Sequence, residues 1–430
     1  YFLMRILGFL ILSLLSCSAL MSEPLSFSGS AEKVILINGK TGVILYEKNM
    51  HSPAFPASIT KTATALYVLN RCGDQLDMKV KATQDALASI SPQAKKQSNY
   101  RNPPHWLETD GGHIGIKIGE ELTLRDLLYA MLVCSANDAA NVIAHHVGGT
   151  IPKFMVELNL FLKEMGCKHT HFLNPHGLHH PDHITTAYDQ AMIAREAMKD
   201  PLFRTMVSTV SYTAQKTNLE FERTFKQTNR LLRDGAYYYP YSIGIKTGTT
   251  SAAGKPLIAA AEKHGRELFA VVLETQGNKR YEDTIKLFET AFNQPKMRRT
   301  LLPKGVQKLK SRVVGGRGWL KTALPDGLSY DFYPAEELPV KATVQWEIPL
   351  LPIEKGATVG VVKVMDSKGN TVQSTPLLAA EKVKPTLFFQ LKKSMKEKRK
   401  VVFGVIVSTF FLYAWSRRRK KRKRHSRPLF

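Results

Sequence analysis

The sequence has 430 residues, of which 43% are hydrophobic and 23% are charged. It is too long for one small domain and too apolar to be disordered throughout, so we expect two folded domains plus targeting segments. A net charge of +25 would suit a nucleic-acid-binding protein if it covered the surface evenly. Fifteen Lys or Arg residues and a single Glu, however, lie between Lys392 and Arg427. Because the charge is concentrated at one end, no nucleic-acid partner is expected.

Residues 1–21 are interpreted as a signal peptide. Arg5 precedes an uncharged run at 6–15, and small residues follow at 16–19. This order is typical of a secretory signal, and the run is too short to span a membrane. A lipoprotein-type cleavage before Cys17 stays open as an alternative. The other cysteines show no disulfide or metal-site spacing and are interpreted as small buried hydrophobes: Cys72, Cys134 and Cys167.

Patterns between 28 and 294 predict an α+β domain. Strand patterns occur near both of its ends, the first two as a hairpin around a Gly-containing turn: 34–38, 43–46, 257–261 and 268–273. Helical periodicity lies between and after them: 58–71, 123–133, 139–146, 151–165, 187–198 and 281–292. Strands at both ends with helices between them predict one antiparallel sheet with a helical insertion.

A second, smaller all-β domain is predicted at 295–385. The sequence Asn293-Gln294-Pro295 ends the helical pattern, and strand alternation dominates from 300 to about 383. Runs such as 340–348 and 359–365 carry this alternation. No pattern in the sequence indicates an oligomeric state.

The end of the chain is predicted to form a basic linker at 386–400, a membrane anchor at 401–415 and a basic cytoplasmic tail at 416–430. The anchor run carries no charge and is followed by eight consecutive Lys or Arg residues at 417–424. An apolar run halted by a basic block is typical of a segment whose basic side stays cytoplasmic. Such a run spans roughly 22 Å as a helix, against a hydrocarbon core of about 30 Å. Both a spanning and an interfacial anchor are compatible with this length.

Three short motifs carry the candidate chemistry. Ser58-Ile59-Thr60-Lys61 begins a predicted helix, so its first and last side chains share one helical face. Ser135-Ala136-Asn137 falls between two predicted helices, and Lys246-Thr247-Gly248-Thr249 lies on a predicted strand. Since a serine with an adjacent amine base recurs in nucleophilic catalysis, the first motif predicts the reacting group.

The charges of the three motifs suit one another. Ser58 needs a base, and Lys61 can take its proton only when neutral. Burial and the cation Lys246 would both lower the pKa of Lys61 and so favour the neutral form. Ser135 can relay a proton toward a leaving amine, and Asn137 can hold a peptide carbonyl.

The strand that bears Lys246 predicts how an extended peptide would bind. Its backbone can pair with the peptide, and Gly248 leaves room for that close approach. The backbone N–H groups of Ser58 and Thr249 would form an oxyanion hole.

The sequence gives little support to three other kinds of site. The cluster His179-His180-Pro181-Asp182-His183 could suggest a metal site, but it lies in a loop-like stretch without a cysteine nearby, so no metal or other cofactor is expected. No GxSxG elbow is present for a Ser-His-Asp triad. A class A β-lactamase would need a Glu in an ExxLN run, and the comparable run ending in Leu158-Asn159 has Met155 at that place.

With its three motifs, SxxK, SxN and KTG, in this order, the chain resembles the D-alanyl-D-alanine carboxypeptidases, the low-molecular-mass penicillin-binding proteins similar to penicillin-binding protein 5. Further stretches are similar to this family: 119–124 (GEELTL), 137–140 (NDAA), 170–178 (THFLNPHGL), 186–189 (TAYD), 229–232 (NRLL) and 246–254 (KTGTTSAAG). Ala136 departs from the Gly usual in the second motif, and the carboxy-terminal segment looks more like a true span than in many relatives.

The resemblance implies a transpeptidase/β-lactamase-like catalytic domain, a β-rich second domain as spacer and a carboxy-terminal attachment to the cytoplasmic membrane, with the catalytic domain outside the cytoplasm. It also implies that Thr247 and Arg280 receive the free carboxylate of a terminal D-alanine. The expected activity is removal of that D-alanine from peptidoglycan pentapeptide stems through an acyl-enzyme on Ser58, with β-lactams as inhibitors. A DD-endopeptidase and a non-catalytic, anchored peptidoglycan-binding scaffold stay open as alternatives.

Overall fold

The computed structural model describes residues 25–337, 339–366 and 369–424. Contacts divide this part of the chain into two compact units. The first unit comprises 25–296 with 333–337, and the second comprises 297–332 with 339–424. The predicted signal peptide and the last six residues of the predicted tail lie outside the described residues.

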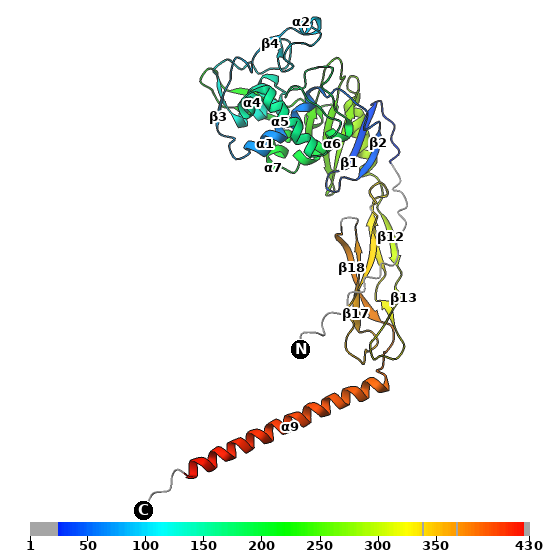
Figure 1. The fold of residues 1–430 in the computed structure, drawn as a ribbon. Helices are drawn as coiled ribbons and strands as arrows, with labels where there is room; N and C mark the ends of the chain where they lie inside the picture. The colour runs from blue at the N-terminus through cyan, green and yellow to red at the C-terminus, as the bar shows by residue number, and fades with distance from the viewer. Residues whose placement is uncertain (1–24, 338, 367–368, 425–430) are drawn as a thin grey trace, which may run out of the picture. The chain divides into compact units, whose positions relative to one another are not determined.

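The first unit is built on a five-stranded antiparallel sheet in the order β2-β1-β11-β10-β9 (Figure 1). Its strands are β1 (Lys33–Asn38), β2 (Ile44–Lys48), β9 (Ser242–Thr247), β10 (Leu257–Lys263) and β11 (Arg266–Leu273). Because side chains alternate along a strand, Ile35 and Ile37 enter one hydrophobic core while Val34 and Leu36 enter the other. Apolar residues on both faces therefore place this sheet between two layers.

Helices cover both faces of this sheet. On one side lie α1 (Thr60–Cys72), α3 (Leu124–Val133), α4 (Asn137–Gly148), α5 (Ile151–Glu164), α6 (Ala187–Ala197) and α7 (Pro201–Ser208); on the other lies α8 (Lys279–Phe292). Threonines begin three of these helices, since the hydroxyls of Thr123, Thr150 and Thr186 each accept a backbone N–H three residues on. The predicted α+β fold, a sheet with a helical insertion, is confirmed.

Several short elements complete the first unit and were not predicted. They are three 3-10 turns, η1 (Ala57–Ile59), η2 (Arg230–Leu232) and η3 (Pro334–Glu336), the helix α2 (Pro92–Gln97), and three strand pairs: β3 (Lys79–Lys81) with β6 (Glu121–Thr123), β4 (Ser89–Ile90) with β5 (Leu107–Glu108), and β7 (Ser211–Ala214) with β8 (Arg223–Lys226). Tertiary contacts hold them, for example the ion pair of 2.6 Å between Arg223 and the buried Glu120. They are too short to show a period in the sequence.

The second unit contains an antiparallel sheet in the order β13-β14-β18-β17-β16 and a two-stranded ribbon of β12 with β15. The strands are β12 (Met297–Leu302), β13 (Gly305–Arg312), β14 (Trp319–Leu324), β15 (Leu328–Phe332), β16 (Lys341–Trp346), β17 (Thr358–Met365) and β18 (Thr371–Ala379). Alternating aliphatic side chains, such as Val362 and Val364 on β17, form its core. The sheets confirm the β-rich character predicted for this stretch.

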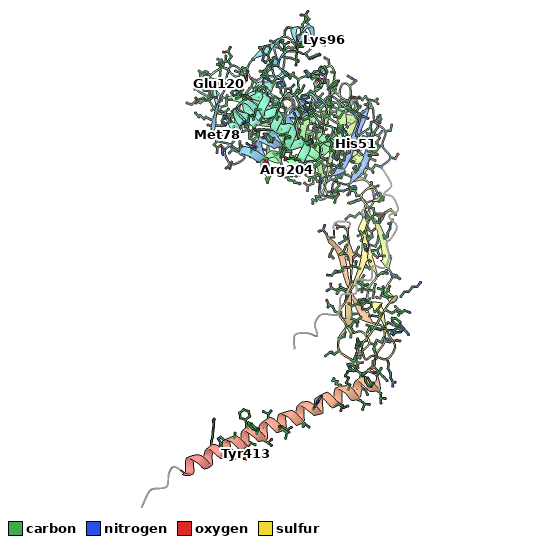
Figure 2. All side chains as sticks on the ribbon, viewed as in Figure 1. His51, Met78, Lys96, Glu120, Arg204 and Tyr413 are labelled. Carbon is green, nitrogen blue, oxygen red and sulfur yellow. The ribbon has the colours of Figure 1, made fainter. Side chains whose placement is uncertain are left out.

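One continuous helix, α9 (Leu387–Arg424), runs through the residues that the sequence divides into linker, anchor and tail. Lys, Arg, Glu and Met are good helix formers, so composition changes along this segment without a break in the backbone. Large apolar side chains such as Phe410, Phe411 and Tyr413 are exposed on it, and Figure 2 shows Tyr413 projecting from the helix. Within the described ranges, no helix is both long enough and apolar enough to cross a bilayer.

Candidate active site

The candidate nucleophile Ser58 lies in η1, which leads directly into α1. Ala57 before it has a φ of 49°, in the left-handed region that residues other than glycine rarely adopt. The Ala57 carbonyl accepts a hydrogen bond of 2.9 Å from the Thr60 hydroxyl. It also lies against Gly177, where a Cβ would come within 1.9 Å of the Ala57 oxygen. The contacts with Thr60 and Gly177 therefore fix the backbone conformation of Ala57, the residue directly before Ser58.

Lys61 is fully buried one helical turn after Ser58. Its Nζ lies 3.0 Å from Ser58 Oγ, 2.7 Å from Asn137 Oδ1 and 2.6 Å from the carbonyl oxygen of His176. Burial, and then the charge of Lys246, hold the pKa of Lys61 well below its ordinary value. A neutral amine that donates its two protons to Asn137 and His176 keeps its lone pair for the hydroxyl of Ser58. This geometry can activate a serine.

Ser135 and Asn137 lie at the turn between α3 and α4, in the context that the sequence predicts. Ser135 has a φ of 67°, and its Oγ accepts a hydrogen bond of 2.9 Å from Lys246 Nζ. The backbone N–H of Asn137 donates to the carbonyl of Gly112 at 2.8 Å. Each serine of the site thus contacts one buried lysine, Ser58 with Lys61 and Ser135 with Lys246.

Lys246 reaches the site from β9, the edge strand of the sheet. Burial, with a smaller contribution from the charge of Arg280, lowers the pKa of Lys246 to about 7. Both protonation states of this amine are therefore populated near neutral pH, so it can donate or accept a proton. The free edge of β9 can pair with an extended peptide, because no further strand of the sheet lies beyond it in the described part of the chain.

Thr247, Gly248 and Arg280 meet at one end of the site. A Cβ on Gly248 would lie 2.8 Å from Pro256 Cγ, so only glycine fits here without displacement of its own neighbours. Arg280 Nη1 donates to the Gly248 carbonyl at 2.8 Å, and Arg280 Nε is buried without a hydrogen-bond partner in the described residues. The Thr247 hydroxyl lies 2.9 Å from that of Thr228, a residue that the sequence analysis missed. These groups can bind a carboxylate.

Thr249, the last residue of the third motif, follows Gly248 along the chain beyond β9. Its hydroxyl donates to the Gly248 carbonyl at 2.7 Å, so the side chain is held close to its own backbone. The oxyanion role of its N–H stays a proposal.

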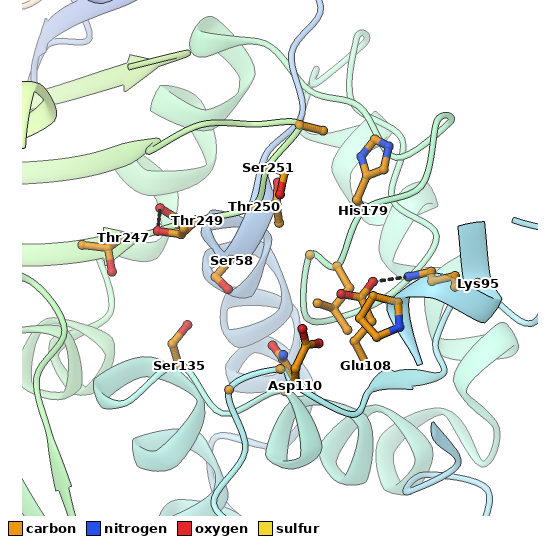
Figure 3. Close-up of a pocket in the computed structure, with 18 of the residues that line it drawn as sticks. Ser58, Lys95, Glu108, Asp110, Ser135, His179, Thr247, Thr249, Thr250 and Ser251 are labelled. Carbon is orange, nitrogen blue, oxygen red and sulfur yellow. Dashed lines mark hydrogen bonds and ion pairs between the residues drawn. The ribbon is translucent and has the colours of Figure 1, made fainter. Parts of the chain in front are cut away.

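An open cavity of about 930 Å³ is lined by residues of all three motifs, namely Ser58, Ser135, Asn137 and residues 247–249 (Figure 3). In the figure Thr247 and Lys95 lie at opposite ends of the cavity, with Ser58 between them. The wall beyond Ser58 comes from α2 and the loop after it: Pro92, Lys95, Lys96, Tyr100, Glu108 and Asp110. The sequence analysis missed this wall, because its residues form no recognisable motif and α2 is only six residues long.

A buried chain of hydrogen bonds runs from His183 through Thr60 to Ala57, the residue before Ser58. The sequence analysis did not predict it. His183 Nδ1 accepts the backbone N–H of Leu173 at 3.0 Å, so the ring proton lies on Nε2. Nε2 lies 2.9 Å from the Thr60 hydroxyl, which in turn donates to the carbonyl of Ala57. Burial holds the pKa of His183 well below its ordinary value, so the ring is neutral. The ring therefore acts as a fixed donor.

The segment 173–183 supports the first turn of α1 in other places too. The Pro175 carbonyl accepts the Thr64 hydroxyl at 2.7 Å, and His176 accepts from Lys61 through its carbonyl. His179 instead lines the cavity, with its ring 4.6 Å from that of Phe55. The histidines of this loop thus point in different directions. Among the described residues, no group of three or more His, Cys, Asp or Glu side chains is arranged to hold a metal ion.

Comparison with known proteins places these residues in a family. The model of the family described as D-alanyl-D-alanine carboxypeptidase (Peptidase_S11) matches residues 20–277, which include all three motifs. The D-alanyl-D-alanine carboxypeptidase DacF of Bacillus subtilis is 29% identical over 374 residues, which cover 85% of this chain and 89% of the relative.

Solved structures give the same picture for the fold. Penicillin binding protein 5 from Haemophilus influenzae has a TM-score of 0.56 at 24% identity and covers 84% of this chain and 100% of its own, so this likeness concerns the fold. The Streptomyces K15 DD-transpeptidase has a TM-score of 0.53 at 28% identity and covers 62% of this chain and 98% of its own.

Proposed function

Since the chain belongs to the serine-type D-alanyl-D-alanine carboxypeptidase family, we propose that it removes the terminal D-alanine from peptidoglycan pentapeptide stems. One observation carries this proposal: buried Lys61 has its Nζ 3.0 Å from Ser58 Oγ, with two further acceptors for its protons. A serine in this setting can be deprotonated near neutral pH.

In the proposed acylation, Ser58 Oγ attacks the carbonyl carbon of the penultimate D-alanine, and its proton passes to Lys61 Nζ. The oxyanion accepts hydrogen bonds from the backbone N–H groups of Ser58 and Thr249. Ser135 gives its proton to the nitrogen of the leaving D-alanine and takes one from Lys246, 2.9 Å away. The C–N bond breaks, D-alanine leaves, and the stem stays on Ser58 as an ester.

Deacylation completes the cycle. After solvent has re-equilibrated the two amines, water attacks the ester carbonyl and gives its proton to neutral Lys61. Ser58 takes that proton as the C–O bond to it breaks, and the shortened stem leaves as a carboxylic acid. Each serine returns to its starting state, and no oxidant or metal takes part.

The charged and hydrogen-bonding groups of the cavity determine how the substrate is oriented in it. Arg280 and the hydroxyls of Thr228 and Thr247 hold the carboxylate of the terminal D-alanine. The free edge of β9 pairs with the extended stem, and Asn137 holds the carbonyl of the residue that precedes D-alanyl-D-alanine. β-Lactams enter the same place and acylate Ser58.

The test uses the full chain in mild detergent with a pentapeptide ending in D-alanyl-D-alanine and with a fluorescent penicillin. D-alanine release and a label on Ser58, located by peptide mapping, are expected. Ser58→Ala should abolish both, whereas Ser208→Ala, at an exposed serine on α7, should change neither. Absence of both signals in the unaltered chain would sink the proposal and leave the scaffold alternative. If the protein cleaved a cross-linked stem dimer faster than the pentapeptide, its main activity would be that of an endopeptidase rather than a carboxypeptidase.

The proposal includes export and attachment to the cytoplasmic membrane through α9. Exposed Phe410, Phe411 and Trp415 lie next to the cations that begin at Arg417, a combination suited to an anionic membrane surface. The full chain should sediment with anionic lipid vesicles, and Phe410→Asp with Phe411→Asp should release it. Phe221→Asp, at a side chain that is 88% exposed on the first unit, is the control. A chain that stays in the supernatant would contradict the attachment.

A further inference from the structure

The cavity has unlike charges at its two ends. Arg280 lies at the end where Thr247 and Thr228 also line the wall. At the other end, beyond Ser58, Lys95 and Glu108 form an ion pair of 2.9 Å. The Lys95 side chain is only 4% exposed, so this pair is closed and largely neutral toward a ligand. The charge that faces a substrate there must come from other residues.

Asp110 supplies a free negative charge at that end. It lines the cavity and is exposed, and it forms no hydrogen bond or ion pair with any residue that the structure describes. Figure 3 shows its carboxylate pointing into the space between Ser58 and the Glu108–Lys95 pair. An acidic side chain held in a cavity beside a reacting serine is placed to meet substrate rather than to stabilise the fold.

The neighbours of Asp110 fix its position relative to the second motif. A Cβ on Gly111 would lie 3.1 Å from Asn137 Nδ2, so the backbone beside Asp110 passes directly along the Asn137 side chain. The Gly112 carbonyl accepts the Asn137 N–H, and the carboxylate of Asp138 accepts the N–H groups of 114–116. These bonds hold the segment against the start of α4.

This placement selects a particular residue of the substrate. The mechanism proposed above puts the terminal carboxylate at Arg280, the scissile carbonyl at Ser58 and the preceding amide at Asn137. The next group to be met along the cavity is the side chain of the residue that precedes D-alanyl-D-alanine. Resting on that proposed function, we propose that Asp110 binds a cationic side chain at this position and makes the enzyme prefer stems that carry a free amine there.

The only other uncompensated charge named on this wall among the described residues is Lys96, which would repel such an amine. Its side chain is exposed and, like Asp110, lines the cavity; Figure 2 labels it on α2. Figure 3 shows the Asp110 carboxylate facing the space beside Ser58, through which the proposed path of the substrate runs. The two residues give a matched pair of charge-removing variants, Asp110→Asn and Lys96→Gln.

The experiment compares D-alanine release from three acetylated peptides, X-D-Ala-D-Ala, in which X is lysine, Nε-acetyl-lysine or norleucine. We expect kcat/KM for lysine to exceed that for norleucine roughly fivefold, the value of one partly exposed ion pair. Asp110→Asn should bring this ratio close to one by lowering the lysine value more than the norleucine value, and Asp110→Glu should restore part of the ratio. Lys96→Gln should keep or increase the preference, and 0.5 M salt should reduce it.

A binding measurement separates this inference from the proposed function. The same peptides are titrated calorimetrically into Ser58→Ala and into Ser58→Ala combined with Asp110→Asn. Tighter binding of the lysine peptide, lost in the double variant, supports the subsite even where no peptide is hydrolysed. Equal affinities for lysine and norleucine peptides overturn it, as does an Asp110→Asn enzyme that loses activity equally on all three. Failure of hydrolysis with a retained lysine preference would instead refute only the proposed function.

Discussion

Thr60→Val should slow the acylation of Ser58 although valine has nearly the shape of threonine. The Thr60 hydroxyl lies between two partners, the Ala57 carbonyl at 2.9 Å and His183 Nε2 at 2.9 Å. All atoms of Thr60 are buried, so water cannot replace the lost bonds. The change therefore removes the only described side-chain bond that holds the Ala57 carbonyl in place, directly before the nucleophile.

The magnitude follows from the one group that loses its partner, since the Ala57 carbonyl still accepts the backbone N–H of residue 60 whereas the ring N–H of His183 is left unsatisfied. An unsatisfied buried group costs about 1–3 kcal/mol, and the free energy of unfolding should fall by about that amount. Ala57, with its φ of 49°, has little intrinsic preference for its conformation and can then relax. Because misplacement of a reacting group by about 1 Å can cost roughly 100-fold, we expect acylation to slow by about 10- to 100-fold.

The assay is stopped-flow acylation by a fluorescent penicillin, with urea unfolding measured in parallel. Thr62→Val is the matched control, since Thr62 is equally buried on α1 but its hydroxyl has no hydrogen-bond partner in the described structure. It should acylate within about twofold of the unaltered chain and unfold at an equal or higher urea concentration. His183→Phe keeps an aromatic ring against Phe172, at a centroid distance of 4.8 Å, and should reproduce the slow acylation of Thr60→Val.

Two results would refute this reasoning. The first is a Thr60→Val protein that loses stability but acylates as fast as Thr62→Val, because the hydrogen-bond chain would then be structural only. The second is a His183→Phe protein with normal acylation, because the ring would then add nothing to the bond from Thr60 to Ala57.

Four further predictions concern the two lysines and one ion pair. Lys61→Arg keeps a cation but loses the base, so penicillin acylation should slow by about 1,000-fold with an unchanged circular dichroism spectrum. The acylation rate should rise with pH through the lowered pKa of Lys61 and fall above about 7 as Lys246 loses its proton, giving a bell-shaped profile. Since folded Lys246 binds fewer protons than the unfolded chain between pH about 7 and about 10.4, urea stability should rise across that window. Glu120→Ala removes a buried carboxylate, leaves the half-buried Arg223 unpaired and should lower the free energy of unfolding by roughly 3 kcal/mol, measured in urea.

The sequence could predict the sheet and the motif contexts because both depend on local pattern. Alternation along 34–38 and 268–273 reflects two buried faces, which holds whatever the partner strands are. The motif serines and lysines lie on the predicted elements, since spacing along a helix or a strand fixes which side chains share a face.

What the sequence could not predict depends on contacts between distant residues. Thr60 and His183 are 123 positions apart, and nothing in either neighbourhood indicates their hydrogen bond. The positive φ values of Ala57 and Ser135 belong to residue types that seldom adopt them, so only the surrounding packing accounts for them. The wall around Asp110 rests on elements of two to six residues, too short for any periodicity.

The order of strands in the sheet has a consequence for when the protein can become active. The first strand, β1, pairs with β2 and with β11, and Lys246 on β9 is joined to β1 only through β10 and β11. Lys246 therefore takes its place in the finished sheet only after residues up to Leu273 have been made. Such non-local pairing makes folding slow compared with that of a helical protein of similar size. The complete site, with both of its lysines, therefore cannot exist before the whole domain has been synthesised.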